Sequence, residues 1–318
     1  MSAGHRKIVV TTHFGWGMHR YRLDLLRSLL GEGYDVTAIA DWSDGAYEAP
    51  VRAEGVKTES ISLTRSRFGP LADFKTLLQL IGKYRRLRPD IVQQFNARTF
   101  LLGAIAARIT GVPVIVNCVN GIGIILGGTM HRYRWLFLPL YRLAFGGRVL
   151  AVFQNSSDRD EMIAAGITVR ERTFHIPGSG VDTEALKPDP TVAPEDRDIV
   201  IMASRMVWSK GVREFVAAAD ALKPRFPHIR FILAGGLSGA YGMHDPDDVD
   251  EAFLQAAVAR GAIEWPGHVE PPALEDMFRR AAAVVLPSFY PEGVPRCLIE
   301  GAAAGAPIVT TDRPGCRD

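Results

Sequence analysis

The feature that most constrains the fold is an alternation of strand-like and helix-like segments, which runs along the chain and restarts past its middle. In the first half, apolar strand-like runs fall at 8–12, 36–40, 91–95, 114–118, 149–153 and 174–176, and helical patterns at 21–30, 71–87, 98–110 and 135–145. In the second half, the strand-like runs are 199–203, 230–234, 283–287 and 308–311, and the helical patterns are 211–222, 248–260, 274–281 and 295–304. This alternation predicts parallel sheets covered by helices on both faces.

A polar, proline-rich stretch at 187–198 separates the two halves and predicts a linker. The length of 318 residues suits two domains of ordinary size. We therefore expect an α/β protein with two doubly wound, Rossmann-like domains, residues 1–187 and 188–318, and a cleft between them.

Charge and cysteine content exclude several classes of protein. The net charge of +2 gives no electrostatic reason to expect nucleic-acid binding. The three cysteines, Cys118, Cys297 and Cys316, are scattered, which favours a reducing compartment over a disulfide framework or a zinc site. No apolar run approaches the ~18–20 residues of a spanning helix, and the first strand-like run is too short for a signal peptide. These features predict a cytoplasmic protein.

The most informative segment for function is 289–300, which follows an apolar strand-like run. It places Glu292 in a loop at the end of a strand and Glu300 about two turns into the next helix. Ligands of open α/β sheets bind beyond the carboxyl ends of the strands. The amides of Gly293 and Val294, near a helix N-terminus, suit an anion such as phosphate. The alternative is that both acids are ordinary solvated surface residues.

A second loop, between the strand-like run 199–203 and the following helix, carries Arg205 and Lys210. Two cations at the start of a helix suit a diphosphate, which Arg binds as a fork and Lys as a point charge. The alternative is that both are surface cations. The acidic run 245–251 favours a solvated loop and a helix start over a metal site, because it lacks the spacing and glycine of a calcium loop.

Glycines follow two strand-like runs of the first half. Gly15 and Gly17 partly match a dinucleotide-binding fingerprint whose third glycine is absent, and they predict a loop that a ligand can approach closely. A second group, at and beyond the end of the run 114–118, either faces the same cleft or forms a plain turn. Its members are Asn117, Asn120, Gly121 and Gly123.

The stretch 131–148 is both basic and aromatic. Helical spacing places four of its residues near one another: Trp135, Leu138, Arg142 and Phe145. One interpretation is a peripheral contact with an anionic membrane surface, to which the arginines at 85, 86 and 88 would add. The other is a helix half-buried in the core with a basic outer face.

Taken together, these segments resemble the retaining glycosyltransferases of family 4, which have the GT-B fold. Residues 203–211 resemble the family's G-R…K-G loop, and 289–300 resemble its P-E-G…E motif. Residues 176–182 and 304–317 resemble the family's N-G-V-D element and the segment after the second glutamate. The resemblance covers nearly the whole chain.

The resemblance implies a role for each charged residue. Arg205 and Lys210 would bind the donor diphosphate. Glu292 would hold the sugar hydroxyls, and Glu300 would hold the ribose of the nucleoside. Arg205, Lys210 and Glu292 are the expected catalytic residues.

Further residues of the expected donor site come from the same resemblance. Three of them, Gly267, His268 and Val269, would flank the base. Gly15 and Gly17 would let a loop close over the phosphates.

The implied activity is transfer of a hexosyl or N-acetylhexosaminyl group from a nucleotide-sugar, with a UDP-sugar as the expected donor, to a glycan or a polyprenyl-diphosphate-linked saccharide. The acceptor follows from segments 89–92 and 120–123, which most resemble bacterial enzymes acting on such lipids. No metal ion is required, no nucleic acid is expected, and the enzyme would work in the cytoplasm or at the inner face of the plasma membrane.

Two departures from the family qualify this expectation. Many relatives carry a His near the sugar after the strand that corresponds to the run 114–118, whereas the nearby polar residues here are Asn117 and Asn120. The chain also ends at Asp318, so we expect a C-terminally incomplete second domain, an uncovered strand at 308–311 and weakened activity. One alternative is a non-catalytic sugar- or nucleotide-binding protein of the same fold. Another is a nicotinamide-dependent oxidoreductase, but the incomplete glycine fingerprint argues against it.

Overall fold

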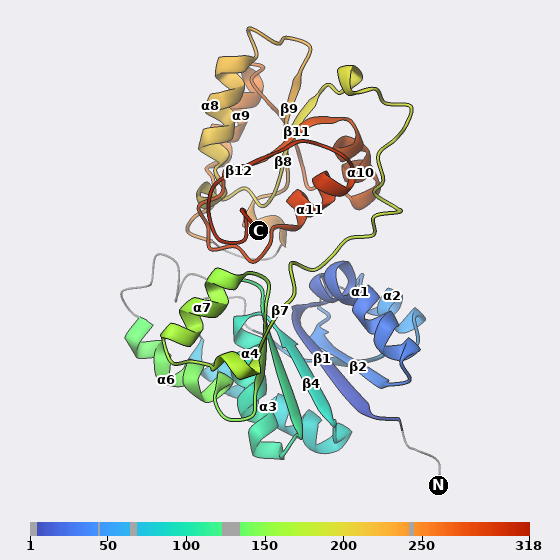
Figure 1. Cartoon of the computed structure of the whole chain (residues 1–318), viewed down its shortest axis with the longest axis vertical. Helices are drawn as coiled ribbons and strands as arrows, with labels where there is room; N and C mark the ends of the chain where they lie inside the picture. The colour runs from blue at the N-terminus through green and yellow to red at the C-terminus, as the bar shows by residue number, and fades with distance from the viewer. Residues whose placement is uncertain (1–4, 44, 64–68, 123–133, 242–244) are drawn as a thin grey trace. The chain divides into compact units, whose positions relative to one another are not determined.

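The computed structural model describes residues 5–43, 45–63, 69–122, 134–241 and 245–318. The chain forms two compact units, Met1–Ser179 and Gly180–Asp318, and each contains one parallel sheet (Figure 1). The predicted boundary between residues 187 and 188 lies a few residues beyond this division and stays a prediction. Each helix among the described residues is too short or too polar to cross a lipid bilayer.

The first unit is built on a seven-stranded sheet with the order β3-β2-β1-β4-β5-β6-β7. Its strands are β1 (Lys7–Phe14), β2 (Asp35–Asp41), β3 (Lys57–Ser60), β4 (Ile91–Phe95), β5 (Val114–Val119), β6 (Leu150–Phe153) and β7 (Thr173–His175). Consecutive residues of β1 enter different cores, because Val9 packs into one cluster and Ile8 and Val10 into another. Burial on both faces explains the unbroken apolar run.

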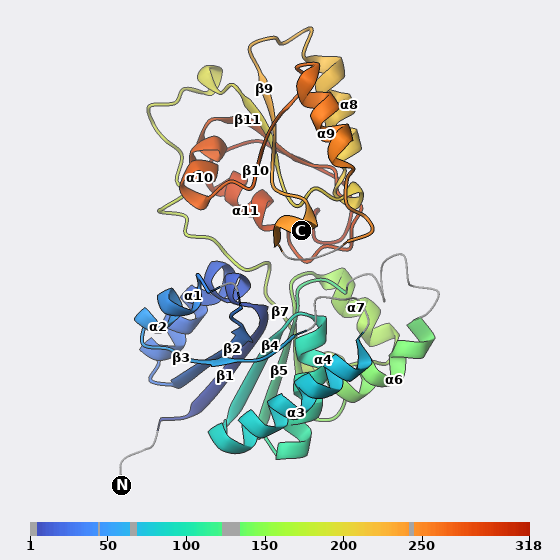
Figure 2. The same ribbon diagram turned by 180° about the vertical axis from the view of Figure 1, so that it is seen from behind.

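The helices of the first unit cover both faces of its sheet. Among the described residues they are α1 (Gly15–Gly31), α2 (Glu48–Ala53), α3 (Pro70–Leu87), α4 (Ala97–Thr110), α6 (Arg134–Phe145) and α7 (Ser156–Ala164). Buried residues of α1 and α2 join the core that contains Val10, whereas those of α3, α4 and α6 join the core that contains Val9. Figure 2 shows α3, α4 and α6 over one face of the sheet.

The second unit contains a five-stranded sheet with the order β10-β9-β8-β11-β12. The strands are β8 (Ile199–Ala203), β9 (Arg230–Ala234), β10 (Glu264–Gly267), β11 (Ala281–Leu286) and β12 (Ile308–Thr310). The main helices are α8 (Val212–Leu222), α9 (Glu251–Ala259), α10 (Pro271–Arg279) and α11 (Arg296–Ala303). The strand order reverses between β8 and β11, and ligands of doubly wound sheets bind at such a point.

The expected architecture of two doubly wound α/β units is confirmed. One local prediction is wrong, because Gly15 and Gly17 form the first turn of α1 and not a loop. The helix begins directly after Phe14, and its buried positions Met18, Arg22 and Leu26 follow helical spacing.

Candidate functional site

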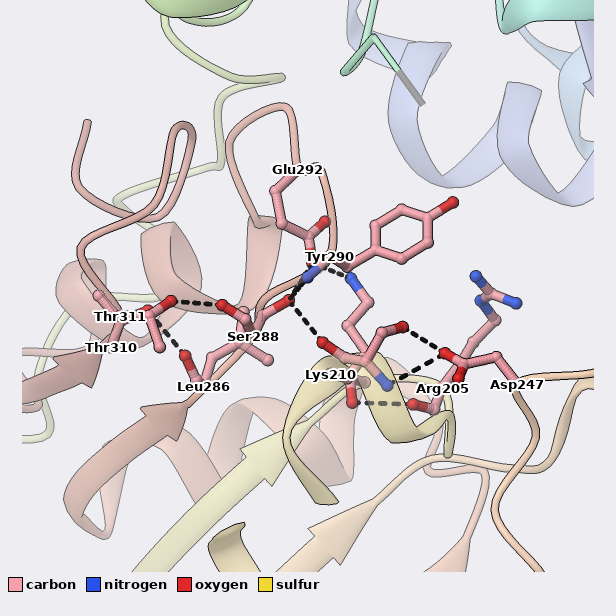
Figure 3. Close-up of polar contacts among 11 residues, drawn as sticks. Arg205, Lys210, Asp247, Leu286, Ser288, Tyr290, Glu292, Thr310 and Thr311 are labelled. Carbon is pink, nitrogen blue, oxygen red and sulfur yellow. Dashed lines mark hydrogen bonds and ion pairs between the residues drawn. The ribbon is translucent and has the colours of Figure 1, made fainter. Parts of the chain in front are cut away.

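The residues predicted to bind the donor in the second unit gather at the carboxyl edge of its sheet. Arg205 and Lys210 lie in the loop after β8, and Glu292 lies in the loop after β11 (Figure 3). Strands β8 and β11 are neighbours at the point where the strand order reverses. The fold therefore brings together two loops that are far apart in the sequence.

At the centre of this site, the Lys210 ammonium forms an ion pair and hydrogen bond with Glu292 Oε1. The side chains of Lys210 and Glu292 are only 14% and 11% exposed. Ser288 Oγ donates to the same carboxylate oxygen at 3.0 Å. The Tyr290 ring lies 5.3 Å from the ammonium, and burial raises the pKa of its hydroxyl. The ammonium thus contacts a carboxylate that also accepts from a hydroxyl, and it lies near an aromatic ring.

Backbone contacts join the two loops. The amides of Phe289 and Tyr290 both donate to Ser209 O, at 2.9 and 3.1 Å. Gly211 follows the short 3-10 helix Trp208–Lys210 and has a φ of 87°. A Cβ at Gly211 would overlap the carbonyl of Pro287, so only glycine permits this approach of the two loops. The relative placement of Lys210 and Glu292 is therefore set by the main chain.

The acidic run 245–251 supports the loop after β8. Asp247 Oδ2 accepts hydrogen bonds from both the amide (3.0 Å) and the hydroxyl of Ser209, and Asp247 O accepts from Trp208 N at 2.9 Å. Asp245 lies 3.5 Å from Arg205 Nη1. We expected a solvated loop here, and the sequence carried no signal that these acids would contact a loop so far from them in the chain.

Within the part of the chain that the structure describes, no three His, Cys, Asp or Glu side chains form a group that could hold a metal ion.

Glu300 lies about one turn into α11, closer to the start of the helix than we predicted, because α11 begins at Arg296. Its carboxylate accepts a hydrogen bond from Arg296 Nε at 2.8 Å, and its side chain is 6% exposed. Gly293 and Val294 lie in the loop before the helix, whose N-cap is Pro295. Helix α11 thus carries a buried carboxylate one turn after its start.

The segment 267–269 lies at the same edge of the sheet, where β10 ends. Gly267 O accepts from Gly235 N at 2.7 Å, and a Cβ at Gly235 would overlap Ser204 O. The backbone thereby connects Gly267 to the start of the loop that holds Arg205. His268 is partly exposed, and its Nε2 lies 3.4 Å from Glu270 Oε1, whereas Val269 packs against the core of the unit.

A further prediction in the first unit is wrong. Asn117 does not face a ligand: it is fully buried, accepts from Gln94 Nε2 at 3.1 Å and donates to Ala144 O at 3.1 Å. The alternation of side chains along β5 points it inward. In α6, Phe145 is buried against Phe100, whereas Trp135 is exposed, so these two residues of the basic stretch differ in their exposure.

The remaining predicted residues of the first unit lie after β5 and in the basic stretch 131–148. Asn120 and Gly121 directly follow β5, and Gly123 lies outside the described residues, as do residues 131–133 of the basic stretch. The Arg142 guanidinium donates to Ala165 O and Gly166 O, at 3.0 and 3.2 Å. Arg142 therefore ties α6 to the loop after α7.

The chemistry available in the second unit is clear from these groups. Two cations can neutralise a diphosphate, and two carboxylates can accept hydrogen bonds from sugar hydroxyls. Both kinds of group lie at the carboxyl edge of one sheet, at its switch point. The arrangement suits an anionic ligand that also carries several hydroxyls.

Comparison with known families agrees with this chemistry. Residues 16–178 match the family described as Glycosyl transferase 4-like domain, and residues 184–318 match Glycosyl transferases group 1. The chain belongs to the group 1 glycosyltransferases, enzymes that transfer a sugar from a nucleotide-sugar, and it has their GT-B fold.

Individual relatives share low sequence identity with this chain, although they match it over most of its length. The chain is 24% identical to the N,N'-diacetylbacillosaminyl-diphospho-undecaprenol alpha-1,3-N-acetylgalactosaminyltransferase of Campylobacter jejuni, over 98% of this chain and 81% of the relative. It is 23% identical to the UDP-Gal:alpha-D-GlcNAc-diphosphoundecaprenol alpha-1,3-galactosyltransferase of Escherichia coli, over 93% and 76%. The structure of Anabaena HepE in complex with UDP-glucose shares the fold, with a TM-score of 0.73, 19% identity, and coverage of 98% of this chain and 82% of HepE.

Proposed function

We propose that this enzyme transfers a sugar from a UDP-sugar to a saccharide carried on a polyprenyl diphosphate, with retention of configuration at the anomeric carbon. The observation that carries the proposal is the grouping of Arg205, Lys210 and Glu292 at the switch point of the second unit. The acceptor is proposed from the two relatives whose names specify undecaprenyl-diphosphate-linked saccharides.

Each residue has a defined task in this proposal. Arg205 and Lys210 hold the diphosphate and neutralise the charge that develops as it leaves, which is where electrostatic stabilisation contributes most to catalysis. Glu292 accepts hydrogen bonds from the sugar hydroxyls, and Glu300 from the ribose. No metal ion is needed, because the two cations provide the required positive charge.

The bond changes follow from the retained configuration. The bond between the anomeric carbon and the diphosphate oxygen breaks, and a bond from the acceptor hydroxyl oxygen forms on the same face of the sugar. The hydroxyl proton passes to the departing phosphate oxygen. In the free enzyme Lys210 is paired with Glu292, so donor binding requires the ammonium to be shared between this carboxylate and a phosphate.

The remaining residues of the carboxyl edge would shape the nucleoside part of the site. We propose that the backbone of Gly267 and Val269, together with His268, borders the base. The amides of Gly293 and Val294 would approach the phosphates from the loop before α11.

The test is release of the nucleoside diphosphate from a panel of UDP-sugars and from GDP-mannose, a donor of different base and sugar. Each donor is incubated with and without a polyprenyl-diphosphate-linked saccharide, and the product is analysed for its anomeric configuration. We expect release that depends on the acceptor and a product of retained configuration. The proposal would be refuted if GDP-mannose were a donor and no UDP-sugar were. An inverted product, or no stimulation by any lipid-linked acceptor, would also refute it.

A further inference from the structure

The outer face of α3 exposes a stripe of large apolar side chains. Leu71, Phe74 and Leu78 are 86%, 59% and 52% exposed, and their spacing places them on one side of the helix. The opposite side, which includes Leu80 and Tyr84, is buried against the sheet. Contiguous apolar surface of this kind marks an interaction site.

Positive charge borders this stripe. At 100° per residue, Lys75 and Arg85 fall on the same outer side of α3, and both are exposed. No ion pair within the described residues involves either of them. The single acid of α3, Asp73, is paired with Arg98 of α4 at 2.9 Å. The outer face of α3 therefore combines apolar side chains with uncompensated cations.

The neighbouring helices extend this face. Helix α3 packs against α4, and α4 packs against α6, so the three form one layer over the sheet (Figure 2). Ile109 of α4 and Leu143 of α6 are exposed, and Trp135 of α6 is 67% exposed. Trp is the side chain best suited to the boundary between lipid and water.

We propose that the outer face of α3, formed by Leu71, Phe74, Leu78, Lys75 and Arg85, docks on an anionic lipid bilayer, with Trp135 of α6 at its flank. The mixture of apolar and cationic side chains matches helices that lie in the membrane interface. A second copy of the chain fits less well, because a two-fold contact would set the cations of α3 against those of the partner. The inference concerns the first unit and does not rest on the proposed donor, acceptor or reaction.

The experiment measures binding of the whole chain to vesicles by sedimentation, without donor or acceptor. Vesicles of phosphatidylcholine alone are compared with vesicles that also contain phosphatidylglycerol. The test variant is L71S/F74S/L78S. Its matched control is V169S/F226S/V258S, which removes exposed apolar side chains elsewhere. Thermal unfolding shows whether both variants retain their fold.

We expect the natural chain to prefer the anionic vesicles, with binding that weakens as salt is added. The α3 variant should lose more than about tenfold in partition, since three apolar side chains would no longer enter the lipid, and the control should lose little. K75Q/R85Q should reduce the preference for anionic lipid while it keeps binding to neutral vesicles. Equal binding by the α3 variant and its control would overturn the proposal. The proposal would also be overturned if L71S/F74S/L78S reduced self-association in solution but left vesicle binding unchanged.

Discussion

Breaking the ion pair between Lys210 and Glu292 should destabilise the second unit even when no ligand is bound. The variant Lys210→Met keeps most of the side-chain stem but leaves the Glu292 carboxylate, which is 11% exposed, without its ammonium. Removing one partner of a buried pair costs ~3–5 kcal/mol. Because both side chains retain some access to water and Ser288 still donates to Glu292, we expect a loss of about 2–3 kcal/mol.

The pair can be separated from its catalytic task by a double-mutant cycle. Glu292→Gln should cost a similar amount, because the Lys210 ammonium then loses its carboxylate. The double variant K210M/E292Q removes both charges, so its loss should fall short of the sum of the two single losses by about 1–3 kcal/mol. Transfer activity should be lost in all three, because each variant lacks Lys210, which we propose holds the diphosphate, or the Glu292 carboxylate, which we propose holds the sugar hydroxyls.

Urea unfolding of the ligand-free proteins measures these losses. The control is Lys187→Met, which removes a cation from an exposed pair with Glu184 (3.9 Å) in the same unit and should change little. Additive losses in the cycle, or single variants as stable as the natural protein, would show that the pair is not a coupled, buried interaction.

Three further predictions concern the surroundings of this pair. Glu300→Gln should weaken UDP binding by about 1–3 kcal/mol in calorimetry, and an unchanged affinity would remove Glu300 from the nucleotide site. Asp247→Asn should weaken donor binding about tenfold or more, because the carboxylate holds two groups of Ser209, whereas Asp250→Asn at the exposed cap of α9 should not. Burial raises the pKa of the Cys297 thiol to about 12, so alkylation near neutral pH should be slow until urea unfolds the chain. Rapid labelling of the folded chain near neutral pH would contradict this assignment. The unfolded thiol loses its proton near pH 9, so the unfolding free energy should fall as pH rises above that value.

Much of the fold could be predicted from the pattern of apolar residues. The expected strands 91–95, 199–203 and 230–234 coincide with β4, β8 and β9. The strands β3 and β10 were not predicted, because they lack the apolar runs of these interior strands. β3 has the sequence KTES and β10 has EWPG, and both lie at or near an edge of a sheet, where apolar runs are not required. An edge strand leaves little trace in hydrophobic periodicity.

The site was only partly predictable for a different reason. Arg205, Lys210 and Glu292 could be found because charged residues follow apolar strands, and parallel strands end at one edge. The role of Asp247 could not be found, because its contact with Ser209 depends on the path of a loop between β9 and α9. Local sequence also could not separate Asn117, which is buried, from a ligand-facing residue, because both would lie at the end of a strand.

The order of the strands in the second unit also sets when the site can form during folding. The loops of Lys210 and Glu292 adjoin, yet α8, β9, α9, β10, α10 and β11 lie between them in the chain. Contacts between residues so distant in sequence form slowly, because bringing them together restricts the conformational entropy of the long segment between them. We therefore expect the amides of Phe289 and Tyr290, which donate to Ser209, to gain protection from hydrogen exchange later in refolding than the amides within α8. An unfinished chain that ends before β11 would hold both cations of the site and neither glutamate.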